Sequence, residues 1–422
     1  MANLNELMAS IAEAIRHKRN ITDKINAQNF PDEIEKITGG GGSKNEPITI
    51  TTNGVYTAPE GVGYSPINVS VKLEGNPLQY VIDNRGGNGK PSCYYLFYHY
   101  LGKSLDSVLS QCDFSKVTDM QQMFYQCFNL TTIPLINTSN VTKMNGMFND
   151  CSSLTTIPQL DTSKVTTMAN MFNDCNYLTA IPELNTSSCT DMGSMFSSCY
   201  RLVSIPQLDT SNVTDMYQMF YRCNITAIPQ LNTSNVTNMT RMFYMCQKLT
   251  TIPQLDTSNA TDMDGMFEWC IELNTIPQLN TSKAIRMNQM FAHCASLTTI
   301  DITHMNTSGN SEFASYCCSL IKLIIRNMNK IPVLSSNAFS YCYHFTGKVN
   351  TTYNPNGLKD GRIYVPDDKV EALKIATNWS IYADIIVPLS LLDATSISDI
   401  NTFEDEEGNI INIDNLSYEE VQ

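Results

Sequence analysis

Cysteine is the residue whose number and spacing first suggest chemistry. The chain has 14 cysteines in 422 residues, enough for a disulfide framework. Eight of them recur at one register of a repeat, at Cys127, Cys151, Cys175, Cys199, Cys223, Cys246, Cys270 and Cys294. Disulfide scaffolds of small secreted domains space their cysteines irregularly, and stacked parallel side chains do not easily reach the disulfide dihedral. The spacing therefore favours buried thiols acting as small apolar residues, with disulfide bonding as the alternative.

Acidic side chains recur at a second register, where they alternate with asparagine. The positions are Asn137, Asp161, Asn185, Asp209, Asn232, Asp256 and Asn280. Stacked carboxylates would lie about 5 Å apart, and alternation moves them to about 10 Å, near a Debye length. We interpret the alternation as relief of like-charge repulsion. A calcium ladder is the alternative, although Ca²⁺ takes six to eight oxygens and only every second coil offers a carboxylate.

Other chemistry-bearing residues form no catalytic pattern. The five histidines (His17, His99, His293, His304 and His344) fall in no metal-binding or triad-like spacing. Gly86-Gly87-Asn88-Gly89-Lys90 lacks the full spacing and the following Ser or Thr of a phosphate loop, so it is predicted to be a turn. No pair of carboxylates stands out as in a glycosidase. The sequence thus predicts no enzyme, no cofactor and no metal site.

Aromatic and arginine side chains gather where the repeats differ from one another. The candidates for a binding surface are Tyr200, Arg201, Tyr217, Tyr221, Arg222, Arg241, Tyr244 and Trp269. Tyr, Trp and Arg are enriched in binding hot spots, and here they belong to the middle and later repeats. Two interpretations stay open: a binding face, or tolerated variation at exposed positions.

These residues belong to eight 24-residue repeats over residues 113–300, each with one Met-Phe pair; one step is 23 residues long. A period in this range predicts a leucine-rich-repeat-like solenoid. Within residues 153–175, Leu154 and Ile157 are expected to face inward from a short parallel strand that ends at Pro158. Thr166 is expected to cap a short helical turn whose buried face includes Phe172. Each coil buries its apolar face only by stacking.

The flanking segments differ in composition from the repeats. We expect an N-terminal helical module (1–38), a glycine-rich linker (39–47), a small β module (48–75) and an N-terminal cap (76–112). Beyond the repeats we expect irregular terminal coils and an α/β cap (301–392), then an acidic tail (393–422). The cap should contain a strand and an amphipathic helix with Val370, Leu373, Ala376 and Trp379.

Charge and hydropathy exclude some classes of partner. The net charge of −14 argues against nucleic acid, because binding phosphates needs clustered Lys and Arg. No stretch has the apolar length of a membrane span, and the N-terminal residues lack the apolar core of a signal peptide. We therefore expect neither membrane insertion nor export by a recognisable N-terminal signal.

Several motifs resemble known families. DTSNVTDM, SLTTIP and MF-x-x-C resemble the BspA-like leucine-rich repeats of bacterial surface proteins over roughly residues 113–345. The segments IAEAIRHKRNITDKINAQNFPDEIEKI, TNGVYTAPEGVGYSPINVSV and IYVPDDKVEALKIATNWSIYADII look like parts of phage and prophage tail-associated proteins. The first resemblance implies a binding solenoid. The second implies attachment to a tail through an N-terminal module.

Together these features predict a non-enzymatic phage tail or baseplate protein of receptor-binding or tail-fibre type. It would be assembled in the host cytoplasm and located in the virion tail. Its expected partners are other virion tail proteins or further copies through residues 1–38, and a host-surface polysaccharide or protein through the repeats. The alternative is a bacterial cell-surface adhesin or a secreted leucine-rich-repeat binding protein.

Overall fold

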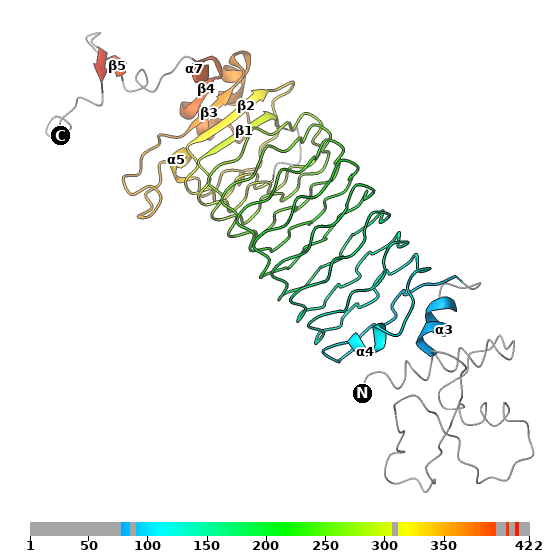
Figure 1. Ribbon diagram of the computed structural model, residues 1–422. Coiled ribbons are helices and arrows are strands. Elements are labelled where there is room, and N and C mark those ends of the chain that lie inside the picture. The colour runs from blue at the N-terminus through cyan, green and yellow to red at the C-terminus, as the bar shows by residue number, and fades with distance from the viewer. Residues whose placement is uncertain (1–76, 85–89, 306–310, 394–401, 405–409, 413–422) are drawn as a thin grey trace, which may run out of the picture. The chain divides into compact units, whose positions relative to one another are not determined.

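A computed structural model describes residues 77–84, 90–305, 311–393, 402–404 and 410–412 (Figure 1). The predictions for residues 1–38, 39–47 and 48–75, and most of that for the acidic tail, lie outside these residues. The chain forms two compact units, Met1–Leu178 and Thr179–Gln422. In each unit the repeats form stacked coils of a leucine-rich-repeat-like solenoid, as the period predicts.

Backbone hydrogen bonds join successive coils through the segment that contains the Met-Phe pair. In the first unit, the amides of Gln122 and Phe124 each donate to a carbonyl one coil further on, at 2.9 Å. In the second unit, the amides of Arg241 and Phe243 do the same, also at 2.9 Å. Isolated parallel bridges such as Asp119 with Lys143 begin this ladder. The short parallel pairing of the coils is thus located just before and through the Met-Phe pair.

The prediction of a short helix at the Met-Phe pair is wrong. This segment consists of consecutive turns, in which the amide of Cys127 donates to the carbonyl of Phe124. Gln122 and Gln126 have positive φ angles of 53° and 59°, which an α-helix does not contain. The amides between these turns point to the next coil instead of four residues back. The Thr166 hydroxyl likewise donates to the Thr142 carbonyl of the neighbouring coil rather than capping a helix.

The prediction of a strand at Leu154 and Ile157 is correct for burial and wrong for secondary structure. Both side chains are buried, but the segment is not a strand. One residue per coil bonds here: the Thr155 amide and hydroxyl both donate to the Thr131 carbonyl, at 3.2 Å. Pro158 follows closely, and because proline has no N–H to donate, the pairing does not extend.

True strands occur on the same side of the last coils. They are β1 (Thr299–His304), β2 (Lys322–Asn327), β3 (Arg362–Val365) and β4 (Ile386–Pro388), which pair in parallel in the order β1-β2-β3-β4. Ile300 pairs with Leu323, and Leu323 pairs with Ile363. Asp301 in β1 and Ile324 in β2 stand where the repeat has its early proline, and because both have an N–H to donate, the ladder runs for several residues.

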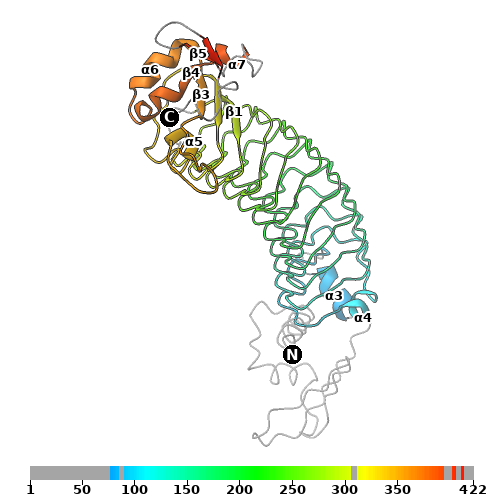
Figure 2. The same cartoon turned by 90° about the vertical axis from the view of Figure 1, so that its left-hand side faces the viewer.

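The expected α/β cap is present at the end of the second unit. In Figure 2, helix α6 (Val370–Ile375) lies beside the sheet, and it contacts β4. Val370 and Leu373 are buried on α6, but the helix ends before the extended residue Ala376. Trp379, expected on the same helix, lies beyond it, fully buried, and donates its Nε1–H to the Pro332 carbonyl at 2.9 Å.

The remaining elements are short. They are α3 (Pro77–Asn84), α4 (Asp106–Leu109), α5 (Tyr343–Thr346), η2 (Asp367–Lys369), η3 (Ser380–Ile385), α7 (Ser390–Asp393), and the antiparallel pair β5 (Thr402–Glu404) and β6 (Ile410–Asn412). No helix among the described residues has the length and apolarity that a membrane crossing requires.

The core of each unit is a set of columns of identical side chains. In the first unit Phe124 stacks on Phe148 with ring centroids 5.4 Å apart and planes 6° apart. In the second unit Phe220 and Phe243 stack at 5.6 Å. The methionines and leucines of the repeats form parallel buried columns beside the rings. This periodic burial is what stacking must supply, because one coil alone has no second apolar layer.

The cysteine column is both buried and hydrogen-bonded. All fourteen cysteines are thiols, so disulfide bonding does not occur in this ladder. The Cys246 Sγ–H donates to the Phe220 carbonyl at 2.9 Å, and the Cys151 Sγ–H donates to the Phe124 carbonyl at 3.0 Å. Burial raises the pKa of the Cys223 thiol to about 12. The thiols of the column are therefore not simply small apolar groups, because they donate hydrogen bonds to carbonyls of the preceding coil.

We predict that Cys246→Ser is more stable than Cys246→Ala by about 1 kcal/mol, because serine keeps a donor for the Phe220 carbonyl. The measurement is urea unfolding of the full chain, with Cys112→Ala as a control because Cys112 is the cysteine that is not fully buried. If the thiol acts only as an apolar group, burying a serine hydroxyl costs stability and the order of the two variants reverses.

Candidate functional site

The residue directly before the column cysteine has a left-handed backbone conformation in every described coil. In the second unit the φ angle of this residue lies between 57° and 64°. From the first coil to the last, the residues are Ser198, Arg222, Met245, Trp269, His293, Tyr316 and Tyr341. Residues other than glycine are uncommon in this region, where Asn, Asp and His are enriched. The first unit uses Gln126, Asp150 and Asp174 there. The second unit thus carries bulky side chains where the backbone disfavours them.

Four of these side chains stack into a continuous row of rings on the surface. Trp269 and His293 have centroids 3.8 Å apart, His293 and Tyr316 4.3 Å, and Tyr316 and Tyr341 4.2 Å, with planes within 15°. Tyr316 and Tyr341 are exposed. The Tyr341 hydroxyl hydrogen-bonds that of Tyr316 and raises the pKa of Tyr316. Burial lowers the pKa of His293, so its ring is neutral at pH 7.

A second pair of rings lies one position earlier in the repeat, and arginines cover it. Tyr221 and Tyr244 stack with centroids 4.9 Å apart. The Arg222 guanidinium lies 5.3 Å from the Tyr221 centroid, and that of Arg241 lies 5.4 Å from the Tyr244 centroid. Both distances are within the range of cation–π attraction. Arg222 also donates from Nε to the Met245 sulfur at 3.4 Å, which joins this pair to the column of the ring row.

We call this surface the aromatic–arginine row. It comprises Tyr221, Arg222, Arg241, Tyr244, Met245, Trp269, His293, Tyr316 and Tyr341.

The structure brings together five of the eight candidates expected from the sequence: Tyr221, Arg222, Arg241, Tyr244 and Trp269. The other three, Tyr200, Arg201 and Tyr217, are exposed and lie at other registers of the repeat. Tyr200 and Arg201 follow the column cysteine. Tyr217 lies two residues after Asp215, which bridges to the neighbouring coils.

Three aromatic residues of the row are not among the candidates that the sequence predicts. His293 is one of the histidines that fall in no catalytic or metal-binding spacing, and Tyr316 and Tyr341 lie beyond the eight regular repeats. The signal that could have found them is their register, because each directly precedes a column cysteine, as Trp269 does.

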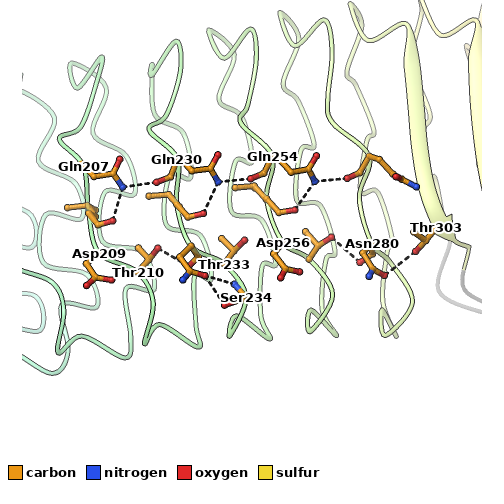
Figure 3. Close-up of a pocket in the computed structure, with 16 residues that line it drawn as sticks. Gln207, Asp209, Thr210, Gln230, Thr233, Ser234, Gln254, Asp256, Asn280 and Thr303 are labelled. Carbon is orange, nitrogen blue, oxygen red and sulfur yellow. Dashed lines mark hydrogen bonds between the residues drawn. The ribbon is translucent and has the colours of Figure 1, made fainter.

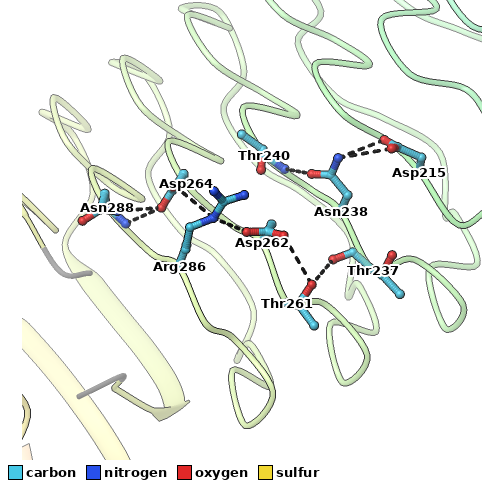
Figure 4. Close-up of polar contacts among 9 residues, drawn as sticks. All are labelled: Asp215, Thr237, Asn238, Thr240, Thr261, Asp262, Asp264, Arg286 and Asn288. Atoms are coloured by element: carbon cyan, nitrogen blue, oxygen red, sulfur yellow. Dashed lines mark hydrogen bonds and ion pairs between the residues drawn. The ribbon is translucent and has the colours of Figure 1, made fainter. Parts of the chain in front are cut away.

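The Tyr217 amide donates to Asp215 Oδ1 at 2.7 Å, and Asp215 belongs to a polar ladder that Figure 4 shows. Asn238 donates from Nδ2 to both carboxylate oxygens of Asp215, at 3.3 and 3.2 Å. Arg286 forms an ion pair with Asp262 and lies 3.7 Å from an oxygen of Asp264. These groups bond to one another between coils, so we interpret the ladder as a structural contact between coils rather than as a binding site.

One buried carboxyl lies beside the aromatic–arginine row. Glu268 is 6% exposed, and its Oε2 has no hydrogen-bond partner among the described residues. Burial raises the pKa of Glu268 to about 7, with Arg241 opposing the shift and Glu312 adding to it. A Cβ on Gly265 would come within 3.0 Å of Oε2, so the carboxyl lies against that glycine. The charge of Glu268 therefore changes near neutral pH, next to Arg241.

The chemistry this surface offers is contact and hydrogen bonding. Over the described residues, no three side chains of His, Cys, Asp or Glu gather as metal ligands would. The turn carboxylates considered for calcium instead accept local bonds: Asp161 Oδ1 accepts from the Ser163 amide and hydroxyl, at 3.0 and 2.7 Å. These bonds lower the pKa of Asp161.

A stack of short coils with a buried Phe and Cys in each is a leucine-rich-repeat-like scaffold, a class that typically binds other molecules without catalysis. A family model described as "Mycoplasma protein of unknown function, DUF285" matches residues 92–202, 152–226 and 222–323. These overlapping matches cover more than half of the chain, and the chain belongs to this family. None of the curated proteins matches the sequence.

Several solved structures are similar. They include a T. pallidum leucine-rich repeat protein (18% identity, 46% of this chain and 78% of that one, TM-score 0.31). A leucine-rich cell surface protein of Faecalibacterium prausnitzii also matches (19%, 70% and 80%, TM-score 0.34). So does a leucine-rich-repeat protein of Eubacterium ventriosum (15%, 55% and 81%, TM-score 0.28). Likeness at this level says nothing about function.

We predict that the free energy of unfolding falls as the pH rises from about 4.5 to 7, because Glu268 loses its proton. The folded state holds the Glu268 proton up to about pH 7, whereas the ordinary pKa of a glutamate is 4.5. Stability from this group is therefore complete below pH 4.5 and is lost as the pH passes the folded pKa. The loss should be on the order of 2 kcal/mol after allowance for solvent screening.

The measurement is urea unfolding between pH 4.5 and 8 for the wild type and for Glu268→Gln. Only the difference between the two profiles reports on Glu268, because His293 titrates in the same range with the opposite sign. Parallel profiles would contradict the prediction.

Proposed function

We propose that this chain is a non-catalytic binding protein of a bacterial cell surface that holds a protein ligand on the aromatic–arginine row. The observation that supports this best is the left-handed backbone under the bulky residues Trp269, Tyr316 and Tyr341. A bulky residue there costs on the order of 1 kcal/mol relative to Gly, Asn or Asp. Non-optimal backbone conformations persist at binding surfaces when the side chain has another use.

The geometry favours a protein over a sugar as the ligand of the row. His293 and Tyr316 each lie between two stacked rings and Trp269 stacks on one, at 3.8–4.3 Å, so the row presents mainly ring edges rather than faces on which a sugar ring could stack. Arg222 and Arg241 are exposed and suit carboxylates of a partner. Rigid aromatic side chains with arginine are the composition of protein hot spots.

The stacking also prepares the surface for binding. Rings held between two neighbours have already lost most of their rotamer freedom in the unbound protein. Ordering them on association then costs little, which is the advantage of a preorganised interface. If the rings serve only as extra contacts between coils, replacing them should lower stability without lowering binding. Experiment can therefore separate the structural role from the binding role.

The cell surface is favoured over the phage tail for the following reason. The repeats carry the resemblance to bacterial surface proteins, and the matching family is described from a bacterial genus. The resemblance to phage tail proteins comes mainly from segments within residues 1–75, which lie outside the described residues. Attachment to a virion tail, or to further copies, through residues 1–38 stays a prediction.

We predict that replacing Arg222, Trp269, Tyr316 and Tyr341 by Asn lowers cell binding at least tenfold. Asparagine tolerates the left-handed backbone, so the coils should stay folded. The matched control places Asn at Gln126, Asp150 and Asp174, the same register of the first unit. Binding of the fluorescently labelled full chain to cultured epithelial cells and to bacteria is measured by flow cytometry, with and without protease treatment of the cells.

The wild type and the control should bind, and protease treatment of the cells should abolish the part of the binding that the row variant loses. Equal binding by the row variant and the wild type, or survival of that part after protease but not after glycosidase treatment, would contradict a protein ligand on the row.

The location gives a separate prediction. Antibodies to the repeats should label intact producing bacteria, and brief trypsin treatment of whole cells should remove the label. Mass spectrometry of phage particles purified from the same culture should find the chain depleted relative to the cell envelope. Enrichment in the particles, with unlabelled cells, would restore the phage-tail interpretation.

A further inference from the structure

A groove of about 880 Å³ runs across successive coils of the second unit, on the segments that follow the early proline of each repeat (Figure 3). Its walls repeat from coil to coil. The lining includes the glutamines Gln207, Gln230, Gln254 and Gln278 and the turn residues Asp209, Asn232, Asp256 and Asn280. It shares no residue with the aromatic–arginine row.

Side chains, rather than a backbone ladder, join the coils along this groove. Gln230 donates from Nε2 to the Leu231 carbonyl at 3.1 Å and to the Gln254 carbonyl of the next coil at 2.7 Å. Gln207 and Gln254 repeat this pattern (Figure 3). The amide N–H groups of the glutamines are therefore used by the scaffold. Their exposed Oε1 atoms accept no bond from other described residues.

The turn residues are fixed in orientation by the serines that follow them. Asn232 accepts at Oδ1 from the Ser234 amide at 3.1 Å and hydroxyl at 2.7 Å. Because a backbone N–H only donates, the atom facing it must be the amide oxygen, which leaves the Asn232 Nδ2 donor outward. Asp256 Oδ1 accepts from the Ser258 amide at 2.9 Å, which leaves Oδ2 as an acceptor.

The row of turn residues thus alternates an acceptor and a donor, one per coil. Asp209 repeats the arrangement of Asp256 through Ser211, and Asn280 repeats that of Asn232 through Ser282. The serine bonds lower the pKa of Asp209 and of Asp256, so both carboxylates stay ionised. The coils follow one another at about the 4.8 Å spacing of paired strands.

We propose that this groove binds a linear, uncharged, hydroxyl-rich polymer, a neutral polysaccharide, laid along the stack of coils. A hydroxyl both donates and accepts, so one kind of group satisfies the Gln Oε1 and Asp Oδ2 acceptors and the Asn Nδ2 donors alike. The Asp209 and Asp256 carboxylates exclude polyanions through like-charge repulsion. The same weak contacts recur on successive coils, so one polymer chain can make many of them at once. Once the first contact forms, the effective concentration of the polymer at the next coil is high.

Alternation therefore has a second use besides spacing the charges. A row of aspartates alone would offer only acceptors and would hold four adjacent charges. A row of asparagines alone would lack the charge-assisted bonds that make hydroxyl binding stronger. The alternating row gives donors and strong acceptors at a regular spacing.

The test uses the full chain and exchanges the donor for an acceptor within the groove. Asn232→Asp keeps the turn, because aspartate fills this register in neighbouring coils, and its matched control is Asn137→Asp in the first unit. The probes are hexamers of neutral linear sugars (β- and α-linked glucose, mannose, galactose and N-acetylglucosamine), hexagalacturonate as the polyanion, and a capped hexathreonine peptide. Binding is measured by calorimetry.

At least one neutral hexamer should bind the wild type. Asn232→Asp should weaken that binding at least fivefold, Asn137→Asp should leave it unchanged, and hexagalacturonate should not bind. The proposal is overturned if no neutral hexamer binds, if the peptide binds and the sugars do not, or if Asn232→Asp has no effect. The aromatic–arginine row variant should bind the sugar normally, so failure here and failure of the protein-binding proposal are distinguishable.

Discussion

The hydrogen bonds that the Met-Phe segment sends to the next coil determine the rest of the structure. An amide can reach the neighbouring coil only if the chain does not close a helix on itself, and the alternate left-handed residues prevent that closure. The same turns direct Met, Phe and Cys inward and the residue before the cysteine outward. Every side chain at that outward register then lies directly above its equivalent in the next coil. Stacking of rings there is a consequence of the ladder.

The structure of the segment after the early proline follows from the absence of such a backbone ladder. Proline ends the backbone pairing after Leu-Thr-Thr-Ile, so the coils are joined beyond it by Gln and Thr side chains. The groove is lined by these side chains and by the turn residues that follow them. One repeat therefore produces two surfaces: a close-packed row of rings, and an open channel lined by amides and carboxylates.

The sequence is enough to predict the period, the solenoid and the inward positions, because burial depends on residue type and spacing alone. Leu154, Met168, Phe172 and Cys175 are all buried as expected. The helix at Met-Phe was wrong because helical and left-handed turn segments place apolar residues at similar intervals, and the sign of φ is not encoded in hydropathy. Trp269 and His293 share a register that the sequence shows, but their stacking depends on the left-handed backbone beneath both side chains. The raised pKa of Glu268 depends on burial and on the charges of Arg241 and Glu312, which lie on two other coils.

The first and second units use one scaffold but fill its outward register differently. Asp150 and Asp174 suit a left-handed backbone, whereas Trp269, Tyr316 and Tyr341 oppose it. Because the ladder bonds are the same under both sets, the ladder does not require the bulky residues. Asparagine at these positions would lower the backbone cost, but it would also remove the contacts between the rings. The ladder alone therefore does not account for the bulky residues, which supports the proposal that they serve a ligand.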